Sequence, residues 1–380
     1  MKSGKKKIAI VVPKYGLMGG GERFVCELTE HLAREPRYDI HVLANKWRAR
    51  SNRVKFHYLP LIRFPRWLTT VSFAYFAARK IRSMKFDVVH AHDRILEADI
   101  CSMHFIPHRI WVREVRRKKL LSLFDRATVW VERKMFSAPR ACKYVLPVSS
   151  LAAEKFEVEY YAREHEVQVV HPGVDPEVFS RGDEGDRNRV RAEFKVSQND
   201  LLILFAGMNF ELKGLDRLLG AMAGSRNESH HRDLKLLVVG KGNIKKYRAI
   251  VSSLGLTEQV FFAGVRHDLP TIYRAADIFA LLSEFDTFGM VVTEAMASGL
   301  PVVISDRVGA KDLVKDAENG FIVDGANLGE ISARIKILAS DGNKRKEMGQ
   351  KARETAAQTT WEAAARKVLE AYRRVTGEEM

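Results

Sequence analysis

The sequence predicts an α/β fold with two doubly wound parallel sheets, one in each half of the chain. Three observations predict it. Short apolar runs rich in β-branched residues alternate with helical patterns throughout, which is typical of parallel sheets covered by helices. The 380 residues exceed what one hydrophobic core usually holds. The alternation breaks at the prolines and glycine of residues 171–179 and then starts again, which indicates a domain boundary.

The first half begins with a strand and a long helix. Residues 21–35 place Phe24, Leu28 and Leu32 on one helical face, as expected of a helix that covers a sheet. Three glycines, Gly19 to Gly21, stand at the start of this helix. The predicted strands of this half are residues 7–12, 39–45, 54–60, 87–92, 98–104 and 144–149.

The second half repeats the same pattern of strand, loop and helix. Its predicted strands are residues 201–207, 234–240, 260–264, 278–283, 301–305 and 320–324. We therefore expect two Rossmann-like domains, residues 1–172 and 173–359, that face each other across a cleft. The last helix starts near Thr360 and is expected to cross back to the first domain as residues 360–380.

The charge of the chain is concentrated in its first half. The formal net charge is +16, and all of this excess falls within residues 1–172, because lysines and arginines equal the acids in number in the remainder. Such a field attracts a polyanion: nucleic acid, an anionic membrane surface or a phosphorylated substrate. The sequence contains no recognisable nucleic-acid-binding module, which disfavours nucleic acid as the partner. Cys26, Cys101 and Cys142 lack metal-ligand spacing and indicate free thiols in a reducing compartment.

One basic segment interrupts the alternation at residues 105–140. It holds Trp111 and Trp130, and it places Phe124 and Val131 on one predicted helical face. Basic residues beside large apolar ones are typical of a segment in a membrane interface, although a pair of surface helices with solvated lysines would show the same pattern. The four consecutive basic residues of this predicted interface are Arg116, Arg117, Lys118 and Lys119.

Residues 283–301 resemble a helix N-terminus presented to an anion. Gly289 precedes an amphipathic run and allows a ligand to approach the first-turn amides, which have no partners inside the helix. Asp286 and Glu294 frame this start, although a capping acid and an ordinary helical glutamate would look the same. Lys213, just ahead of Gly214 in another loop after a strand, could add a fixed positive charge for a diphosphate.

Several motifs are absent. The sequence has no P-loop, no G-x-G-x-x-G after its first strand and no Asp-x-Asp pair, which disfavours P-loop nucleotidases, dehydrogenases and a metal-held nucleotide diphosphate. His90 and His92 alternate at a strand end, but no further Cys or His lies near enough in sequence to predict a metal site.

Together these motifs resemble the retaining family-4 glycosyltransferases of the GT-B type. The resemblance covers almost the whole chain, and its most specific part is DTFGMVVTEAMASGLPVV at residues 286–303. The basic insert and the length are most similar to members that glucosylate the first heptose of the lipopolysaccharide core. The resemblance implies a metal-independent hexosyltransferase without a cofactor, using a nucleotide sugar such as UDP-glucose. The implied acceptor is an anionic glycolipid, and the implied location is the inner face of the cytoplasmic membrane.

The resemblance also implies roles for individual residues. Glu294 would hold the donor ribose, and Lys213 would neutralise the leaving diphosphate. Asp286 and His104 would contact the transferred sugar. The remaining donor-binding residues would act mainly through their backbone, and they are Gly19, Gly20, Phe288, Gly289 and Met290.

The chain departs from the family at two positions. The family usually has glutamate where this chain has Asp286, and arginine where it has Met208. These departures keep open a non-catalytic membrane-bound scaffold beside the leading interpretation. Transfer to another polysaccharide or lipid carrier is a further alternative. The sequence leaves the oligomeric state open.

Overall fold

The computed structural model describes residues 5–17, 19–137, 142–160, 165–180, 182, 184–224 and 234–377. The chain forms two compact units, which we call unit 1 and unit 2. Unit 1 comprises Met1–Pro172 with Trp361–Met380, and unit 2 comprises Gly173–Thr360. No helix in this described part is both long and apolar enough to cross a membrane.

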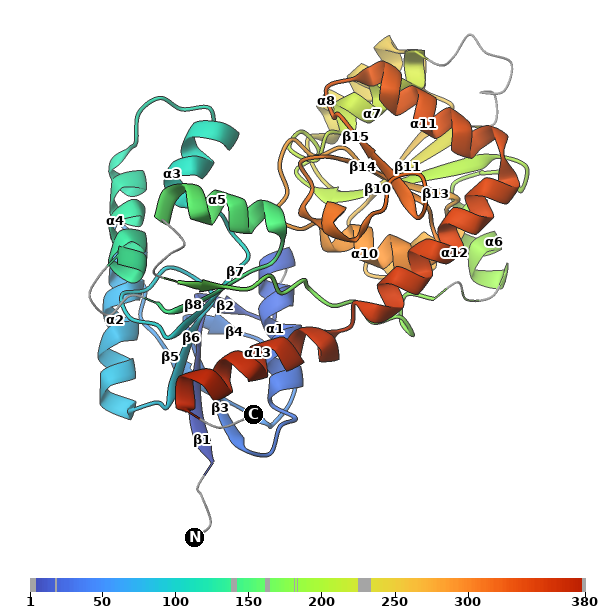
Figure 1. The fold of residues 1–380 in the computed structure, drawn as a ribbon. Helices are drawn as coiled ribbons and strands as arrows, with labels where there is room; N and C mark the ends of the chain where they lie inside the picture. Colours follow the sequence, from blue (N-terminus) through green and yellow to red (C-terminus); the bar gives the residue numbers. More distant parts are fainter. Residues whose placement is uncertain are drawn as a thin grey trace. The chain divides into compact units, whose positions relative to one another are not determined.

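Unit 1 is built on a parallel sheet of seven strands in the order β5-β3-β1-β6-β7-β8-β9 (Figure 1). Its middle strands are buried on both faces, as the continuous apolar runs predict. A two-residue pair, β2 (Lys14–Tyr15) and β4 (Lys46–Trp47), lies outside this sheet. The strands of the sheet are β1 (Lys6–Val11), β3 (Tyr38–Ala44), β5 (Val54–Tyr58), β6 (Val88–Ala91), β7 (Ile100–Met103), β8 (Tyr144–Pro147) and β9 (Glu166–Val167).

Helices cover the sheet of unit 1. Helix α1 buries Phe24, Leu28 and Leu32, the face that the sequence predicts. The C-terminal helix α13 packs beside α1 (Figure 1) and places the Tyr372 hydroxyl 2.9 Å from Nδ1 of His90, so this end of the chain is part of unit 1. The helices are α1 (Gly20–Leu32), α2 (Leu68–Met84), α3 (His108–Ile110), α4 (Leu123–Ser137), α5 (Ser150–Tyr160) and α13 (Trp361–Thr376).

Unit 2 is a parallel sheet of six strands in the order β12-β11-β10-β13-β14-β15. The chain runs outward from β10 to β12 and then returns to the other side of β10 with β13, so the winding reverses between β10 and β13. Ligands of open α/β sheets bind outside the carboxyl ends of the strands at such a switch point. The strands are β10 (Leu201–Met208), β11 (Leu234–Lys241), β12 (Val260–Gly264), β13 (Ile278–Leu281), β14 (Val302–Ser305) and β15 (Gly320–Val323).

The helices of unit 2 flank this sheet (Figure 1). The short helix α10, which follows β13, is buried from Val292 to Ala297 and packs on α12. These helices are α6 (Glu184–Glu193), α7 (Leu215–Gly224), α8 (Ile244–Ser253), α9 (Leu269–Ala275), α10 (Met290–Ala297), α11 (Leu328–Ser340) and α12 (Gly342–Gln358).

The basic segment differs from its prediction as one helical face. A π-helical turn, Trp111–Val115, is followed by a loop, and α4 begins only at Leu123. Two local causes stop the helix. Arg117 has a φ of 50°, outside the helical region, and Ser122 donates from Oγ to the Asp125 carboxylate at 2.6 Å, which fixes a new helix start.

Candidate functional site

Two loops meet at the switch point of unit 2. The loop after β10 turns at Asn209 and Gly214, which have φ angles of 68° and 74°. A Cβ on Gly214 would overlap the carbonyl oxygen of Leu282, so glycine is required where this loop approaches the one after β13. The amide of Glu284 donates to the carbonyl of Leu212 at 2.9 Å and joins the two loops.

An ion pair between Lys213 and Asp286 bridges these loops. The side chains are only 19% and 12% exposed, and Nζ of the lysine contacts Oδ2 of the aspartate. Gly207 leaves room for the lysine stem, since a Cβ there would lie 3.0 Å from Lys213 Cγ. Two of the three predicted catalytic residues therefore contact each other directly. Asp286 orients the lysine, a relationship that the sequence did not reveal.

The backbone beside Asp286 is firmly held. Its amide donates to the Arg307 carbonyl and its own carbonyl accepts from Gly309, both at 3.0 Å. The Ala310 amide donates to the Phe288 carbonyl at 2.7 Å. These hydrogen bonds fix the backbone of residues 286–288 just before helix α10 and so limit the positions that the Asp286 carboxylate can reach.

Helix α10 begins at this point without a side-chain cap. Its N-cap residue, Gly289, has a φ of 87°, and a Cβ there would lie 3.0 Å from Val308 Cγ1 and 3.3 Å from Asp286 Oδ2. Uncapped first-turn amides together with the helix dipole favour an anion at such a position. The structure therefore places Phe288, Gly289 and Met290 where the sequence predicted a diphosphate grip.

Glu294 lies within α10 and is 2% exposed. One of its oxygens, Oε2, accepts a hydrogen bond of 2.9 Å from the Tyr273 hydroxyl, which also lies 3.1 Å from the Val291 carbonyl. Tyr273 was not among the predicted site residues, because nothing in its local sequence separates it from an ordinary core tyrosine.

Lys213 is the strong cation of this loop. Met208 ends β10 and is 46% exposed, so it offers no charge. Arg217, one turn into α7, donates to the carbonyl of Leu282 at 3.1 Å and thereby holds the loop after β13. Within the described residues, no group of three or more His, Cys, Asp or Glu side chains is placed to hold a metal ion.

In unit 1 the predicted site residues also gather at a carboxyl edge. His104 follows β7 and lies against the start of α1, where a Cβ on Gly21 would come within 2.9 Å of its Nδ1. Gly20 has open space around its Cβ position, and Gly19 has a φ of 145°. The sequence singled out Gly19 and Gly20 but not Gly21, the glycine that admits the histidine.

His104 ends a buried row of histidines. The rings of His92 and His104 stack at 6.1 Å, and His90 lies 4.3 Å from His92. His90 is satisfied by Tyr372 and by Ser102, whose Oγ is 2.8 Å from Nε2. Burial lowers the pKa of His90 to about 3, and it lowers the pKa values of His92 and His104. These imidazoles are therefore neutral at physiological pH and can only donate or accept hydrogen bonds.

This histidine row predicts acid sensitivity. A histidine whose pKa is lowered by folding takes up its proton more readily when unfolded, so its contribution is complete above about pH 7 and is lost as the pH falls below the unfolded value of about 6.5. By pH 5.5 we expect the titration of His92 to lower the free energy of unfolding by roughly 1 kcal/mol. Urea unfolding at pH 7.5 and 5.5 measures this loss.

The matched variant for this prediction is His92→Met. Neither ring nitrogen of His92 has a hydrogen-bond partner among the described residues, so methionine removes the titration without breaking a recorded bond. We expect the variant to lose less stability on acidification than the parent protein. Equal losses would show that His92 does not titrate on unfolding.

The predicted membrane-interface residues differ in their surroundings. Arg116 donates to the buried carboxylate of Asp125 at 2.9 Å, which also contacts Nε2 of His108 at 2.9 Å, so Arg116 has a structural role. Burial would raise the pKa of Asp125, but the hydrogen bonds from Ser122 and His108, together with the attraction of Arg116, hold it well below its usual range. Trp111 is partly covered within the π-helical turn. Arg117, Lys118 and Lys119 are exposed as predicted.

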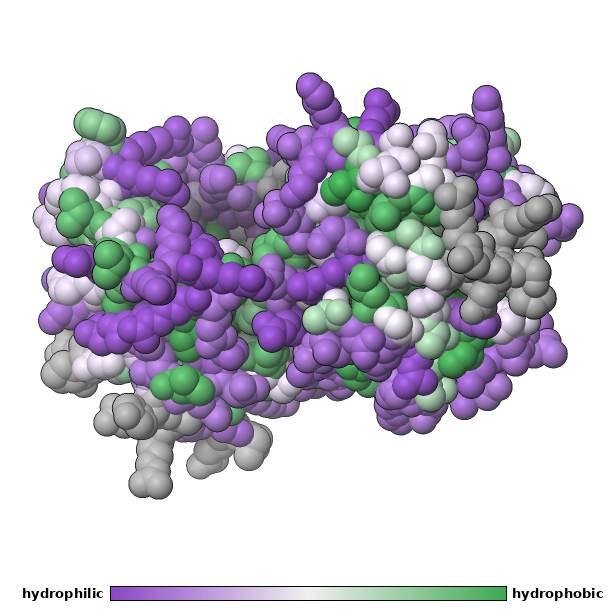
Figure 2. All heavy atoms as spheres, turned by 90° about the horizontal axis from the view of Figure 1, so that it is seen from above, coloured by the Kyte–Doolittle hydropathy of each residue, from purple (hydrophilic) through white to green (hydrophobic). Residues whose placement is uncertain are grey.

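A second loop lies beside this one and was missed by sequence reasoning. The Arg66 guanidinium stacks on the Phe124 ring at 4.8 Å, which joins residues 62–67 to the start of α4. Phe64 is 88% exposed and Leu120 is 82% exposed. Figure 2 shows green apolar atoms between purple hydrophilic ones on this half of the molecule. We name the exposed set the basic apolar surface: Ile62, Arg63, Phe64, Arg66, Trp67, Arg117, Lys118, Lys119, Leu120 and Leu123.

Each half of the chain matches a model of a known protein family. A model described as Glycosyltransferase Family 4 matches residues 18–178, and one described as Glycosyl transferases group 1 matches residues 186–355. A D-inositol 3-phosphate glycosyltransferase from Corynebacterium kroppenstedtii is 33% identical over 221 residues, which are 56% of this chain and 49% of that protein. The chain thus spans about half the length of the curated relatives it matches.

Solved structures share the fold. WaaG, a glycosyltransferase involved in lipopolysaccharide biosynthesis, matches with a TM-score of 0.82 at 20% identity and covers 97% of this chain and 100% of its own. HepE from Anabaena, in complex with UDP and glucose, matches with a TM-score of 0.73 at 19% identity over 96% and 98% of the two chains. The prediction of two Rossmann-like domains of the GT-B type is confirmed.

Proposed function

We propose that this chain, which belongs to the group 1 glycosyl transferases of the GT-B type, transfers a hexose from a nucleotide sugar to an anionic glycolipid. UDP-glucose is the proposed donor, and a lipopolysaccharide core heptose is the proposed acceptor. The observation that carries the proposal is the arrangement of Lys213, Asp286 and Glu294 around the uncapped start of α10.

The donor is held by unit 2 in this proposal. Glu294 accepts the two ribose hydroxyls through its buried carboxylate, whose oxygens are hydrogen-bond acceptors. The amides at Gly289 and Met290 face the diphosphate, together with the positive end of α10. Lys213 stabilises the charge that grows on the leaving diphosphate, so the proposed transfer proceeds without a metal or cofactor.

The chemical step is proposed to retain the configuration of the sugar. The bond from the anomeric carbon to the diphosphate oxygen breaks, and a bond to the acceptor hydroxyl oxygen forms on the same face. The hydroxyl proton passes to the departing phosphate oxygen. His104, whose pKa is lowered by burial, is the proposed hydrogen-bond partner of a sugar hydroxyl, because a neutral imidazole can both donate to and accept from a hydroxyl.

The acceptor is expected to be anionic. The excess positive charge of the chain falls in residues 1–172, which attracts phosphorylated groups. Inositol phosphate is a second candidate acceptor, because relatives at about one-third identity are named D-inositol 3-phosphate glycosyltransferases. Both candidates present phosphate beside a free hydroxyl, so they share the chemistry that a basic domain recognises.

A transfer assay separates these acceptors. The protein is incubated with UDP-glucose and either an inner-core glycolipid or inositol 3-phosphate, and UDP release and the mass of the acceptor are followed. We expect the glycolipid to gain one hexose and to accelerate UDP release. UDP release that is accelerated only by inositol 3-phosphate would identify that compound as the acceptor in place of the glycolipid. Absence of UDP release with both acceptors and every nucleotide sugar would contradict the transferase assignment.

We also propose that the basic apolar surface binds the inner face of the cytoplasmic membrane. Its arginines and lysines suit anionic headgroups, and its exposed Phe64 and Leu120 suit the headgroup boundary. Neutralising Arg117, Lys118 and Lys119 together should weaken binding to anionic vesicles by roughly a hundredfold, at about 1 kcal/mol for each charge. Vesicle sedimentation measures the change.

The triple variant leaves Arg116 in place, because that residue pairs with Asp125. A separate control variant is Val158→Ser. Val158→Ser removes an apolar side chain of α5 that is 69% exposed and lies outside the basic apolar surface, so it should bind vesicles as the parent does. Binding that ignores lipid charge, or that survives the triple substitution, would count against this surface.

A further inference from the structure

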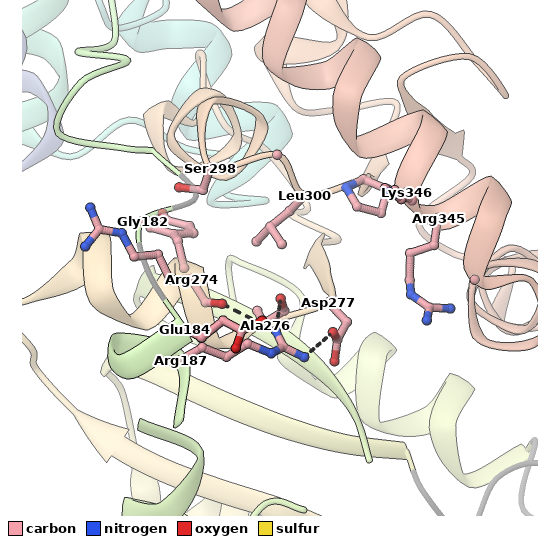
Figure 3. Close-up of a pocket in the computed structure, with 14 residues that line it drawn as sticks. Gly182, Glu184, Arg187, Arg274, Ala276, Asp277, Ser298, Leu300, Arg345 and Lys346 are labelled. Atoms are coloured by element: carbon pink, nitrogen blue, oxygen red, sulfur yellow. Dashed lines mark hydrogen bonds and ion pairs between the residues drawn. The ribbon is translucent and has the colours of Figure 1, made fainter. Parts of the chain in front are cut away.

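A cavity of about 360 Å³ lies within unit 2 (Figure 3). Asp277 and Pro301 line it just before strands β13 and β14, whereas Lys213 and Asp286 follow strands β10 and β13. In a parallel sheet, residues just before the strands and residues just after them lie at opposite ends of the strands. The cavity is therefore a separate feature from the donor site.

Most acceptors in the cavity wall are already occupied. Arg187 donates to the Asp277 carboxylate at 2.7 Å and to the Ala276 carbonyl at 3.2 Å, as dashed lines in Figure 3 indicate, and it also donates to the Ala275 carbonyl at 3.1 Å. Arg274 pairs with Asp186 at 2.5 Å. The last turn of α10 is closed by Ser298, which donates from both its amide and its hydroxyl to the Glu294 carbonyl. Arg187 and Arg274 therefore stabilise the cavity wall, and their donors are engaged by protein groups.

The positive charge that remains comes from α12. Arg345 uses one nitrogen on the carbonyl of Leu338 at 2.5 Å and keeps its other donors. Lys346 is exposed and makes no hydrogen bond or ion pair among the described residues. The opposing charge is Glu184, because Asp277 is neutralised by Arg187 and by Arg191. Two cations face one acid across a space large enough for a small metabolite.

We propose that this cavity binds a phosphorylated small molecule through Arg345 and Lys346. A guanidinium with free donors and an ammonium beside it match the oxygens of a phosphate monoester. The apolar part of the wall, from Leu300 and Pro301, suits the carbon skeleton of such a ligand.

The cavity is mechanically connected to the donor site, and this second part rests on the proposed function. Its wall contains Ser298 and Gly299, which directly follow α10, and the first turn of that helix carries the proposed diphosphate grip roughly 12 Å away. Tyr273, which also lines the cavity, donates to Glu294. Helix α12 also packs closely against the turn that follows α10, because a Cβ on Gly349 would overlap the Gly299 carbonyl. A ligand that moves α12 therefore changes donor affinity, and the donor changes ligand affinity by the same factor.

Calorimetric titration tests the binding with inorganic phosphate and, separately, glucose 6-phosphate as probes. The proteins are the parent, the double variant Arg345→Ala/Lys346→Ala, the charge reversal Lys346→Glu, Lys213→Ala, and the control Lys351→Ala from the same helix. We expect saturable binding in the parent, in Lys213→Ala and in the control, and at least roughly tenfold weaker binding in the other two. Preference for glucose 6-phosphate would show that the carbon skeleton is also bound.

Three results would overturn the proposal: absence of binding by the parent, binding that survives both cavity variants, or binding that requires Lys213. UDP-glucose is titrated into the same proteins with and without glucose 6-phosphate. A cavity that binds phosphate while the donor affinity stays constant would overturn only the coupling. Absence of phosphate binding in the parent, together with normal UDP-glucose binding, would overturn the cavity and leave the proposed function intact.

Discussion

Replacing Glu294 with alanine should lower kcat/KM for the nucleotide sugar by roughly 10²- to 10⁴-fold. The proposed ribose contacts are two hydrogen bonds to a charged acceptor, each contributing about 1.5–3 kcal/mol. Their loss falls on the whole reaction path, because ribose is bound in both the ground state and the transition state. Initial rates of UDP release against donor concentration measure the change, and KM should carry most of it.

Two variants separate binding from folding. Tyr273→Phe removes the hydroxyl that donates to Glu294 but keeps the carboxylate, so its kcat/KM should fall only about tenfold. Glu294→Gln keeps the volume and the Tyr273 contact but removes the charge, and we expect an effect between the other two. If Glu294→Ala were as active as Tyr273→Phe, the carboxylate would not hold the ribose.

The second large effect is expected from Lys213→Ala, with kcat lower by roughly 10²–10³-fold and a smaller change in KM. The lysine is proposed to stabilise charge that develops on the leaving diphosphate, and removing one such donor typically costs about 2.7–4 kcal/mol in the transition state. The measurement is the steady-state rate at saturating donor. Lys241→Ala is the matched control, since this exposed lysine ends the neighbouring strand β11.

The partner of this lysine gives a distinct kinetic pattern. In Asp286→Asn the lysine keeps its charge but loses the carboxylate that orients it, so kcat should fall while KM for the donor falls or stays constant. A rise in KM with unchanged kcat would instead show that Asp286 acts as a ground-state sugar ligand. The pattern therefore distinguishes a positioning role from direct sugar contact.

The strands of both units could be predicted because parallel strands buried on both faces carry continuous apolar runs. Residues 201–208 and 278–281 show this directly in sequence and in burial. The pairing of Lys213 with Asp286 could not be predicted. It depends on the order of strands in the sheet, which places two loops 73 residues apart in sequence beside each other.

The basic segment shows a different limit of sequence reasoning. Helical spacing continued across residues 116–122, but a single left-handed residue, Arg117, and the Ser122 contact to Asp125 divided the segment. Arg116 was turned toward a buried carboxylate that lies nine residues further along. Local periodicity carries no signal for such a contact, and the adjoining residues 62–67 are likewise brought in only by tertiary packing.

The central claim is that unit 2 binds a nucleotide sugar without a metal, through Glu294 and the start of α10. Its most direct test is calorimetric titration with UDP-, GDP- and ADP-sugars in buffer containing EDTA, for the parent and for Glu294→Ala. We predict one saturable site for one of these donors, UDP-glucose foremost, and its loss in the variant. Equal binding by the two proteins, or binding that appears only when a divalent metal is added, would contradict the account.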